Sequence, residues 1–328
     1  MKAFVMRTYG TPDDLALTDL DKPVPADGEV LVRVRATSVN PYDWHHIIGQ
    51  PYIARLMPGT MGLRGPKFAI PGCDMAGTVE AVGSAVPGFR PGDDVFALLR
   101  DGGFAEHVCV PADLLARKPA NMSHEQAAAV PMAAVTALLG LRDTGGLKPG
   151  QRVLVNGASG GVGTFAVQIA VALGASVTGV CGARNADLVR SLGADSVLDY
   201  RTEDFTSRGQ RYDLVLDVAG GHSGRACARA LTASGTLVLV GGPAGRWVQP
   251  AGHAFSALAL GPVMSQRIAL AETGRCDRKR ELLSALTELI EDGKVSTVID
   301  RGYPFVEIPA AVAYQAAGHC AGKVVVTV

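Results

Sequence analysis

Two patterns of apolar and polar positions divide this chain. Up to about residue 122, short apolar runs separated by Pro-Gly pairs are typical of β-strands joined by tight turns. From about residue 150, apolar strand segments alternate with helical segments, which predicts a doubly wound parallel sheet. The expected strands are Val30–Ala36, Gly77–Val82, Asp94–Leu98 and Glu106–Val110 in the first part, and Arg152–Asn156, Ser176–Val180, Ser196–Asp199, Leu214–Asp217 and Leu237–Val240 in the second.

Helix signals and the last strand complete the outline. Ser123 and Gln126 have the spacing of a capping box and predict a helix that continues through an alanine-rich stretch to Leu141. A charged helix over Lys279–Asp292 leads into short β-like pieces and a final strand, Lys323–Val328, which should pair with the first sheet. We therefore expect one domain from residues 1–122 and 276–328, and a second from residues 123–275.

Composition limits the kind of protein this is. The 328 residues are 48% hydrophobic, yet no apolar run approaches the roughly 20 residues of a membrane helix. Thirty-one basic and 31 acidic residues give no net charge, which disfavours nucleic acid or acidic lipid as a partner. The six cysteines are scattered without a Cys-x-x-Cys pair, which argues against a zinc knuckle or a disulfide framework. The first residues have the pattern of a strand rather than of a secretion signal, so we expect a cytoplasmic protein.

A glycine-rich turn lies between an apolar strand and a helix. The strand Val153–Val155 runs into Asn-Gly-Ala-Ser-Gly-Gly-Val-Gly, with a helix from Thr164 to Leu173 after it and a second strand beyond. Glycines let the backbone approach phosphate oxygens, and the free N–H groups of a helix start donate to them. We predict that a dinucleotide pyrophosphate binds there, at Ser159, Gly160, Gly161 and Val162.

The segment after the second strand of that unit indicates NADPH. NAD-selective folds place an acid there, which binds the ribose hydroxyls and repels a 2′-phosphate. This chain has Gly182 and Arg184 instead, and a guanidinium suits phosphate; the alternative for Arg184 is a solvated surface charge at a helix start. Tyr200, after the third strand, either contacts the cofactor or packs inside. Gly241, after the fifth, should lie at the ligand-binding edge of the sheet.

The order of these parts and several motifs resemble those of a known family. The order of a β-rich part, a nucleotide-binding part and a short return is similar to the medium-chain dehydrogenase/reductase superfamily. Further motifs resemble its zinc-independent quinone oxidoreductase branch, which includes zeta-crystallin-like enzymes; they are Ser38–Trp44, Pro71–Val79, Val130-Pro131 with Thr136-Ala137, and Leu192–Asp195. The resemblance implies an α/β fold with a Rossmann domain that binds NADPH and a β-rich, GroES-like catalytic domain.

The resemblance also implies a reaction, hydride transfer from NADPH to a quinone or an α,β-unsaturated carbonyl. Asn40 and Thr136 would lie near the nicotinamide and the substrate carbonyl, where they could stabilise developing charge. Zinc-dependent relatives have a cysteine at the position of Asn40 and a His-Glu pair at that of Cys73-Asp74. Because those ligands are replaced here, we expect no zinc.

Two residues are candidates for the proton donor. His45 stands where relatives place a tyrosine beside the cofactor, and the alternative is that it packs beside Trp44. Tyr52 is either a donor or a wall of the pocket. Asp43 and Asp74 are first expected to accept backbone N–H groups, and Cys73 to be a buried small residue.

Other functions remain open. One alternative is an enoyl reductase acting on a thioester or polyketide-type intermediate, and another is a non-catalytic NADPH-binding module. Stoichiometric metal would revive a zinc alcohol dehydrogenase. The resemblance implies a homodimer, with Gln266–Leu270 as a plausible edge strand. Residues 52–67 and 243–256 should line the acceptor side, and the long loop 49–71 should cover it, but the natural acceptor cannot be predicted from these residues.

Overall fold

The computed structural model describes residues 1–57, 60–242, 245–259, 261 and 264–328, which form two compact units. The first unit contains Met1–Met132, Asp277–Glu291 and Ile299–Val328, and the second contains Ala133–Cys276 and Asp292–Val298. The expected division at 122/123 thus falls inside the first unit. Of the segments expected to line the acceptor, residues 58–59 and 243–244 lie outside the described residues. None of the helices in the described ranges combines the length and apolar character that crossing a bilayer requires.

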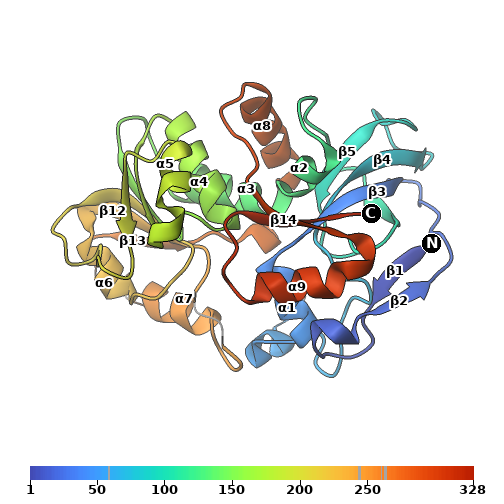
Figure 1. The fold of residues 1–328 in the computed structure, drawn as a ribbon, viewed down its shortest axis with the longest axis horizontal. Helices are drawn as coiled ribbons and strands as arrows, with labels where there is room; N and C mark the ends of the chain where they lie inside the picture. Colours follow the sequence, from blue (N-terminus) through green and yellow to red (C-terminus); the bar gives the residue numbers. More distant parts are fainter. Residues whose placement is uncertain (58–59, 243–244, 260, 262–263) are drawn as a thin grey trace. The chain divides into compact units, whose positions relative to one another are not determined.

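The first unit is built on a long strand, β3 (Glu29–Val39), which pairs antiparallel with three others. One of them is β15 (Lys323–Thr327), so the prediction that the end of the chain returns to the first sheet is confirmed. The sheet runs β14-β15-β3-β4-β5-β7, with β6 also on β3, and a separate pair is formed by β1 and β2 (Figure 1). Their bounds are β1 Lys2–Val5, β2 Ala16–Asp19, β4 Asp74–Val82, β5 Asp94–Leu98, β6 His107–Pro111, β7 Leu115–Arg117 and β14 Ile299–Pro304.

Two helices of the first unit were not expected, because only β-like pieces were predicted there. Helix α1 (Pro41–Ile48) begins directly after β3, since Pro41 presets a helical φ and the Asp43 carboxylate accepts the Asn40 N–H at 2.8 Å. Helix α9 (Ile308–Ala316) buries Ile308, Ala311 and Val312. Its apolar side consists largely of small residues, which give a weak helical period.

The alanine-rich stretch after Ser123 is not one helix. The capping box is confirmed, because the Gln126 N–H donates to Ser123 Oγ at 3.2 Å and the Ser123 N–H donates to Gln126 Oε1 at 2.9 Å. Helix α2 (His124–Ala128) then ends before Pro131, which lacks an N–H and begins α3 (Pro131–Leu138). A π-helical turn, Leu139–Thr144, follows. The charged helix α8 covers Lys279–Glu291 and buries Leu282, Leu283, Leu286 and Ile290.

The second unit is the predicted doubly wound parallel sheet. Its order, β10-β9-β8-β11-β12-β13, is that of a dinucleotide-binding fold, and every adjacent pair is parallel. Figure 1 shows α4 and α5 on one face of this sheet and α6 and α7 on the other. The bounds are β8 Arg152–Asn156, β9 Ser176–Cys181, β10 Ser196–Asp199, β11 Tyr212–Asp217, β12 Leu231–Leu239, β13 Arg267–Leu270, α4 Gly161–Ala172, α5 Ala186–Ser191, α6 Gly224–Arg229 and α7 Ala251–Leu258.

Residues that face inward on these strands hold the second unit together. Leu154, Val215 and Leu237 come from three adjacent strands, and each is fully buried. Burying one such side chain stabilises the fold by about 1.5–3 kcal/mol. The sheet is therefore a rigid support for the loops that leave its carboxyl edge.

Candidate functional site

The glycine-rich turn between β8 and α4, residues 157–163, forms what we call the cradle. Gly157 has φ 89°, a left-handed conformation that favours glycine. A Cβ on Gly163 would lie 2.0 Å from the Gly157 carbonyl oxygen, so the helix can approach the strand this closely only without a side chain there. These two glycines are thus required by the backbone geometry, whereas a Cβ on Gly160 would make only a 3.6 Å contact.

Several N–H groups of the cradle are left open. Gly157 and Ala158 donate to the Val180 carbonyl, and Gly160 donates to Gly157. Among the described residues, no acceptor is found for the N–H groups of Ser159, Gly161 and Val162. Unpartnered donors at a helix start attract a negatively charged group. The predicted cradle residues therefore occupy a place suited to a phosphate.

The loops after β9 and β10 carry the residues predicted to select the cofactor. Arg184 lies on a short 3-10 turn, Ala183–Asn185, directly after β9. Tyr200 follows β10, the neighbouring parallel strand, and is 59% exposed. A Cβ on Gly182 would lie 3.5 Å from the Tyr200 ring, and Asn185 Nδ2 donates to Ser159 Oγ at 3.1 Å. These contacts join the three loops at one edge of the sheet.

Sequence reasoning missed a polar group at the switch point of the sheet, between β8 and β11. Asn156 Nδ2 donates to Asp217 Oδ1 at 2.7 Å and to the Gly220 carbonyl at 3.0 Å. His253 Nε2, on α7, lies 3.5 Å from Asp217 Oδ2, and neither atom has a closer partner in the described part of the chain. Contact with the Asp217 carboxylate raises the pKa of His253. A polar residue at the end of each of two neighbouring strands could have indicated this group.

Thr136 and Gly241 also belong to the second unit. Thr136, on α3, is 6% exposed, and its Oγ1 lies 2.8 Å from the hydroxyl of Thr273, which follows β13. Gly241 follows β12 at the carboxyl edge, and a Cβ there would lie 2.4 Å from the Val218 carbonyl oxygen. Gly241 lies just beyond the end of a strand, as residues near a ligand commonly do, whereas Thr136 lies within α3.

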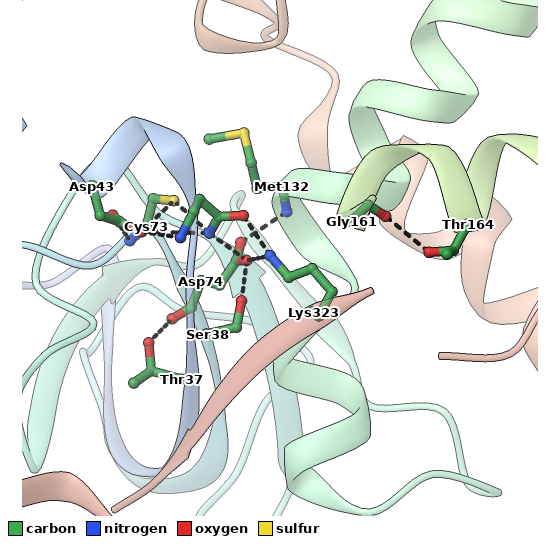
Figure 2. Close-up of polar contacts among 10 residues, drawn as sticks. Thr37, Ser38, Asp43, Cys73, Asp74, Met132, Gly161, Thr164 and Lys323 are labelled. Atoms are coloured by element: carbon green, nitrogen blue, oxygen red, sulfur yellow. Dashed lines mark hydrogen bonds and ion pairs between the residues drawn. The ribbon is translucent and has the colours of Figure 1, made fainter. Parts of the chain in front are cut away.

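In the first unit, polar side chains converge on Asp74, at the start of β4 (Figure 2). We call Ser38, Asn40, Asp43, Cys73, Asp74 and Lys323 the Asp74 cluster. Asp74 is fully buried and accepts from Ser38 Oγ at 2.6 Å, Asn40 Nδ2 at 2.9 Å and the Met132 N–H at 2.8 Å. Its positive partner is Lys323 of β15, whose Nζ lies 3.3 Å from Asp74 Oδ2 and also donates to Asn40 Oδ1. The buried carboxylate is therefore both paired and hydrogen-bonded.

Asp43 and Cys73 form the other side of this cluster. Asp43 accepts from the Asn40 N–H at 2.8 Å and the Cys73 N–H at 3.1 Å, the structural role expected of it. Burial, together with the charge of Asp74, raises the pKa of Asp43 to about 7. Cys73 is fully buried as expected, and burial raises the pKa of its thiol well above the ordinary value. It is therefore a protonated thiol rather than a nucleophile.

His45 lies on α1, and Tyr52 lies on the segment that follows this helix. His45 Nδ1 is 3.0 Å from the Gln50 carbonyl oxygen, and its ring packs 4.7 Å from that of Trp44. A carbonyl only accepts, so Nδ1 carries the hydrogen and the neutral ring has none at Nε2. Burial lowers the pKa of His45, which favours this neutral form. Tyr52 begins a 3-10 turn, Tyr52–Leu56, and the Arg55 guanidinium lies 4.8 Å from its ring centre.

A pocket within the first unit opens next to Asp43. The loop 49–71 contributes one wall, and aromatic and polar side chains from other segments contribute the rest; the lining residues are Met6, Tyr9, Tyr42, Asp43, His46, Met61, Pro66, Lys67, Phe68, Pro71, Gly72, Arg100 and Asp101. Tyr42 and His46 line it, whereas the predicted His45 and Tyr52 do not. In a helix, neighbouring residues point in different directions, so a shift of one residue decides which side chain reaches the pocket.

Comparisons with known proteins agree with these features. The family model described as alcohol dehydrogenase GroES-like domain matches residues 26–120, and the one described as zinc-binding dehydrogenase matches residues 192–326. A chloroplast envelope quinone oxidoreductase homolog of Arabidopsis thaliana is 35% identical over 319 residues, covering 93% of this chain and 91% of the relative. The 2-methylene-furan-3-one reductase of Solanum lycopersicum is 32% identical over 340 residues, covering 99% of this chain and 79% of the relative.

A solved structure extends the similarity to the whole fold. The quinone oxidoreductase of Escherichia coli, solved in complex with NADPH, has a TM-score of 0.84 and 26% sequence identity to this chain. The similarity covers all of both chains. The resemblance stated from the sequence motifs is thereby confirmed.

Proposed function

The chain belongs to the medium-chain dehydrogenase/reductase superfamily, in its quinone oxidoreductase branch, and on this premise we propose that it transfers hydride from NADPH to a quinone or an α,β-unsaturated carbonyl. The observation that carries the proposal is the cradle. Its glycines permit a close approach of backbone to ligand, and the N–H groups of Ser159, Gly161 and Val162, which have no acceptor in the described part of the chain, can donate to phosphate oxygens. The relatives named as quinone oxidoreductase and enone reductase indicate the acceptor class.

Arg184 and Tyr200 form the part of the site that selects NADPH over NADH. Arg184 supplies a permanent charge after β9, where an acid would repel the 2′-phosphate. Tyr200 is exposed enough to lie against the adenine or to donate to the phosphate. A side chain at position 182 would come into contact with the Tyr200 ring, and Gly241 lets the chain after β12 pass close to the Val218 carbonyl oxygen.

The cofactor supplies the hydride, and this chain's residues orient the reactants and exclude water. Asn40 and Thr136 offer an amide and a hydroxyl that can stabilise negative charge on the acceptor oxygen. His45 is poorly suited to give a proton, because its neutral form has no hydrogen at Nε2. Tyr52 has a phenolic O–H that can donate, and it is the better of the two candidates.

The Asp74 cluster does not fit a zinc ion, although one matching family model carries zinc in its name. The Lys323 ammonium contacts Asn40 and Asp74 in the place a metal would need, and would repel it. The Cys73 thiol is held protonated by burial, whereas zinc binds the thiolate. The reaction we propose therefore uses no zinc at this cluster, and stoichiometric metal in the purified protein would contradict that.

The proposal extends to assembly and location. Strand β13 ends the sheet of the second unit, and an edge strand offers unpaired N–H and C=O groups to a second copy. We place a homodimer contact there, to be checked by sedimentation. All six cysteines are free thiols, as is usual in a reducing compartment, and this supports the cytoplasm.

Consumption of NADPH tests the function. The purified chain is mixed with NADPH and a series of quinones, enones and enoyl thioesters of increasing size, and loss of the reduced-nicotinamide absorbance is followed. We expect protein-dependent loss with quinones or enones, and slower loss with NADH. Preference for a thioester would indicate the enoyl reductase instead. Binding of NADPH without consumption by any acceptor would indicate a non-catalytic module.

A further inference from the structure

Lys323 is a charged side chain placed in the interior of the first unit. It is only 3% exposed, although lysine is almost never fully buried without a partner. Its Nζ has two acceptors among the described residues, Asn40 Oδ1 and Asp74 Oδ2. Taking an ammonium and a carboxylate out of water is costly. A simple apolar contact between β15 and β3 would have avoided this cost, so the position calls for another explanation.

The two charges hold the Asn40 side-chain amide at opposite ends. An ammonium can only donate, so it faces the oxygen, Oδ1. A carboxylate can only accept, so Asp74 faces the nitrogen, Nδ2, at 2.9 Å. Rotating the amide by half a turn would put oxygen against the carboxylate and N–H groups against the ammonium. Both contacts would then be repulsive, and the observed orientation is therefore the stable one.

This orientation leaves one hydrogen of Asn40 weakly held. Besides Asp74, the nearest groups to Nδ2 are Cys73 Sγ at 3.3 Å and Asp43 Oδ2 at 3.5 Å. Sulfur is a weak acceptor, and 3.5 Å is long for a hydrogen bond to oxygen. The hydrogen on this side is thus the one that the cluster itself holds least firmly.

We propose that Lys323 is a positioning residue, which fixes the Asn40 amide so that an N–H, and not the carbonyl oxygen, is available to the acceptor oxygen. The inference rests on the proposed function, in which Asn40 stabilises charge on that oxygen. Lys323 acts through Asn40 and does not itself touch the acceptor. Its contribution should therefore vanish when Asn40 is absent.

The first variant is Lys323→Met, which keeps the length of the side chain and removes every donor. Because Lys323→Met leaves Asp74 buried without a counter-ion and could unfold the protein, Lys323→Met/Asp74→Asn removes both charges together. Asn40→Ala, alone and combined with each, completes the set. The matched control is Lys294→Met, because Lys294 is an exposed lysine 3.0 Å from an aspartate, Asp292.

We expect the charge-neutral double variant to bind NADPH within about twofold of the parent but to lose roughly tenfold or more in kcat, as for loss of one oriented donor. Combining the double variant with Asn40→Ala should lower kcat no further than Asn40→Ala alone, since Lys323 and Asp74 act through the Asn40 amide. Lys323→Arg, which keeps a positive donor, should retain part of the kcat that Lys323→Met loses. Parental kcat in the double variant, or a further loss on top of Asn40→Ala, would overturn the proposal.

A second readout does not depend on activity. The side-chain NH2 signals of Asn40, assigned by their absence in Asn40→Ala, should shift in NMR spectra of the double variant and stay unchanged in Lys294→Met. Unchanged Asn40 signals in the double variant would refute the positioning role. A parent that consumes no NADPH with any acceptor would instead refute the proposed function, while the NMR result would still decide how Lys323 acts on the amide.

Discussion

The cradle and the Asp74 cluster differ in whether their polar groups have hydrogen-bond partners within the protein. The cluster satisfies its buried carboxylate with four donors from its own unit, namely Ser38, Asn40, Met132 and Lys323. The cradle has almost no side chains, and several of its N–H groups have no acceptor among the described residues. The Asp74 carboxylate is thus satisfied by its own unit, whereas the cradle leaves donors for a ligand.

The two regions differ in what is already in place before a ligand binds. In the cluster, charge and orientation are prepared before a ligand arrives, which lowers the reorganisation that a reaction would require. In the cradle, the rigid backbone holds donors in place and leaves the negative charge to the ligand. Mutations should therefore affect folding most in the cluster and ligand affinity most in the cradle.

The largest expected effect is on the stability of the cluster. Asp74→Ala leaves the Lys323 ammonium buried without its counter-ion, and breaking a buried ion pair on one side costs about 3–5 kcal/mol. Urea unfolding of the variant should show that loss. The control, Asp94→Ala, removes an aspartate that is 43% exposed and should change the free energy of unfolding by less than about 1 kcal/mol. Equal effects of the two substitutions would mean that the cluster is not a closed unit.

The next effect concerns the cradle and separates two of its glycines. Gly163→Ala forces a Cβ to within 2.0 Å of the Gly157 carbonyl oxygen, so strand and helix must move apart. Overpacking of this kind costs about 1–3 kcal/mol, and we expect the upper end together with loss of NADPH binding. Gly160→Ala meets nothing closer than 3.6 Å and should keep the thermal stability of the parent. Calorimetric titration with NADPH and thermal unfolding measure both variants.

Sequence patterns predicted the cradle better than the cluster, for a physical reason. The cradle is continuous in the chain, and strand, glycine turn and helix each leave a local signal between residues 153 and 173. Strands Arg152–Asn156 and Ser196–Asp199 have the predicted bounds. The cluster joins Asn40, Asp74 and Lys323, and the last is 283 positions from the first. No local pattern shows that a lysine at the start of a terminal strand meets them.

Helices α1 and α9 were missed for a related reason. Their apolar sides are short or made of alanine and valine, so their period is weak, and packing against the first sheet decides the conformation. Because α1 was not foreseen, the directions of its residues could not be assigned. We predicted His45 as a proton donor from the sequence, whereas the residues of this helix that line the pocket are Tyr42, Asp43 and His46.

A smaller effect sharpens the role of charge beside the cradle. Arg184→Ala removes the guanidinium proposed to bind the 2′-phosphate, and a hydrogen bond to a charged group contributes about 1.5–3 kcal/mol. The preference for NADPH over NADH in kcat/KM should fall by roughly ten- to a hundredfold, mainly through weaker NADPH binding. Arg190→Ala is the matched control, because Arg190 is exposed and pairs with Asp187 at 2.8 Å. An unchanged preference in Arg184→Ala would remove Arg184 from the site.

The smallest expected effect is on the pH dependence of stability, and it tests whether His253 and Asp217 form an ion pair in the second unit. Contact with Asp217 raises the pKa of His253, so the folded state holds this proton more tightly than the unfolded state. The resulting stability is full below the ordinary histidine pKa, about 6.5, and is lost as pH rises through the raised value. Cys227, whose pKa Asp217 also raises, stays protonated there because burial lifts its pKa to about 12. Asp217→Asn should therefore lose less stability than the parent as the pH rises above about 6.5. The measurement is thermal unfolding of the parent and of Asp217→Asn as a function of pH. If both lose stability equally as the pH rises, the 3.5 Å contact contributes nothing, and a preformed ion pair is found in the first unit and not at this place in the second.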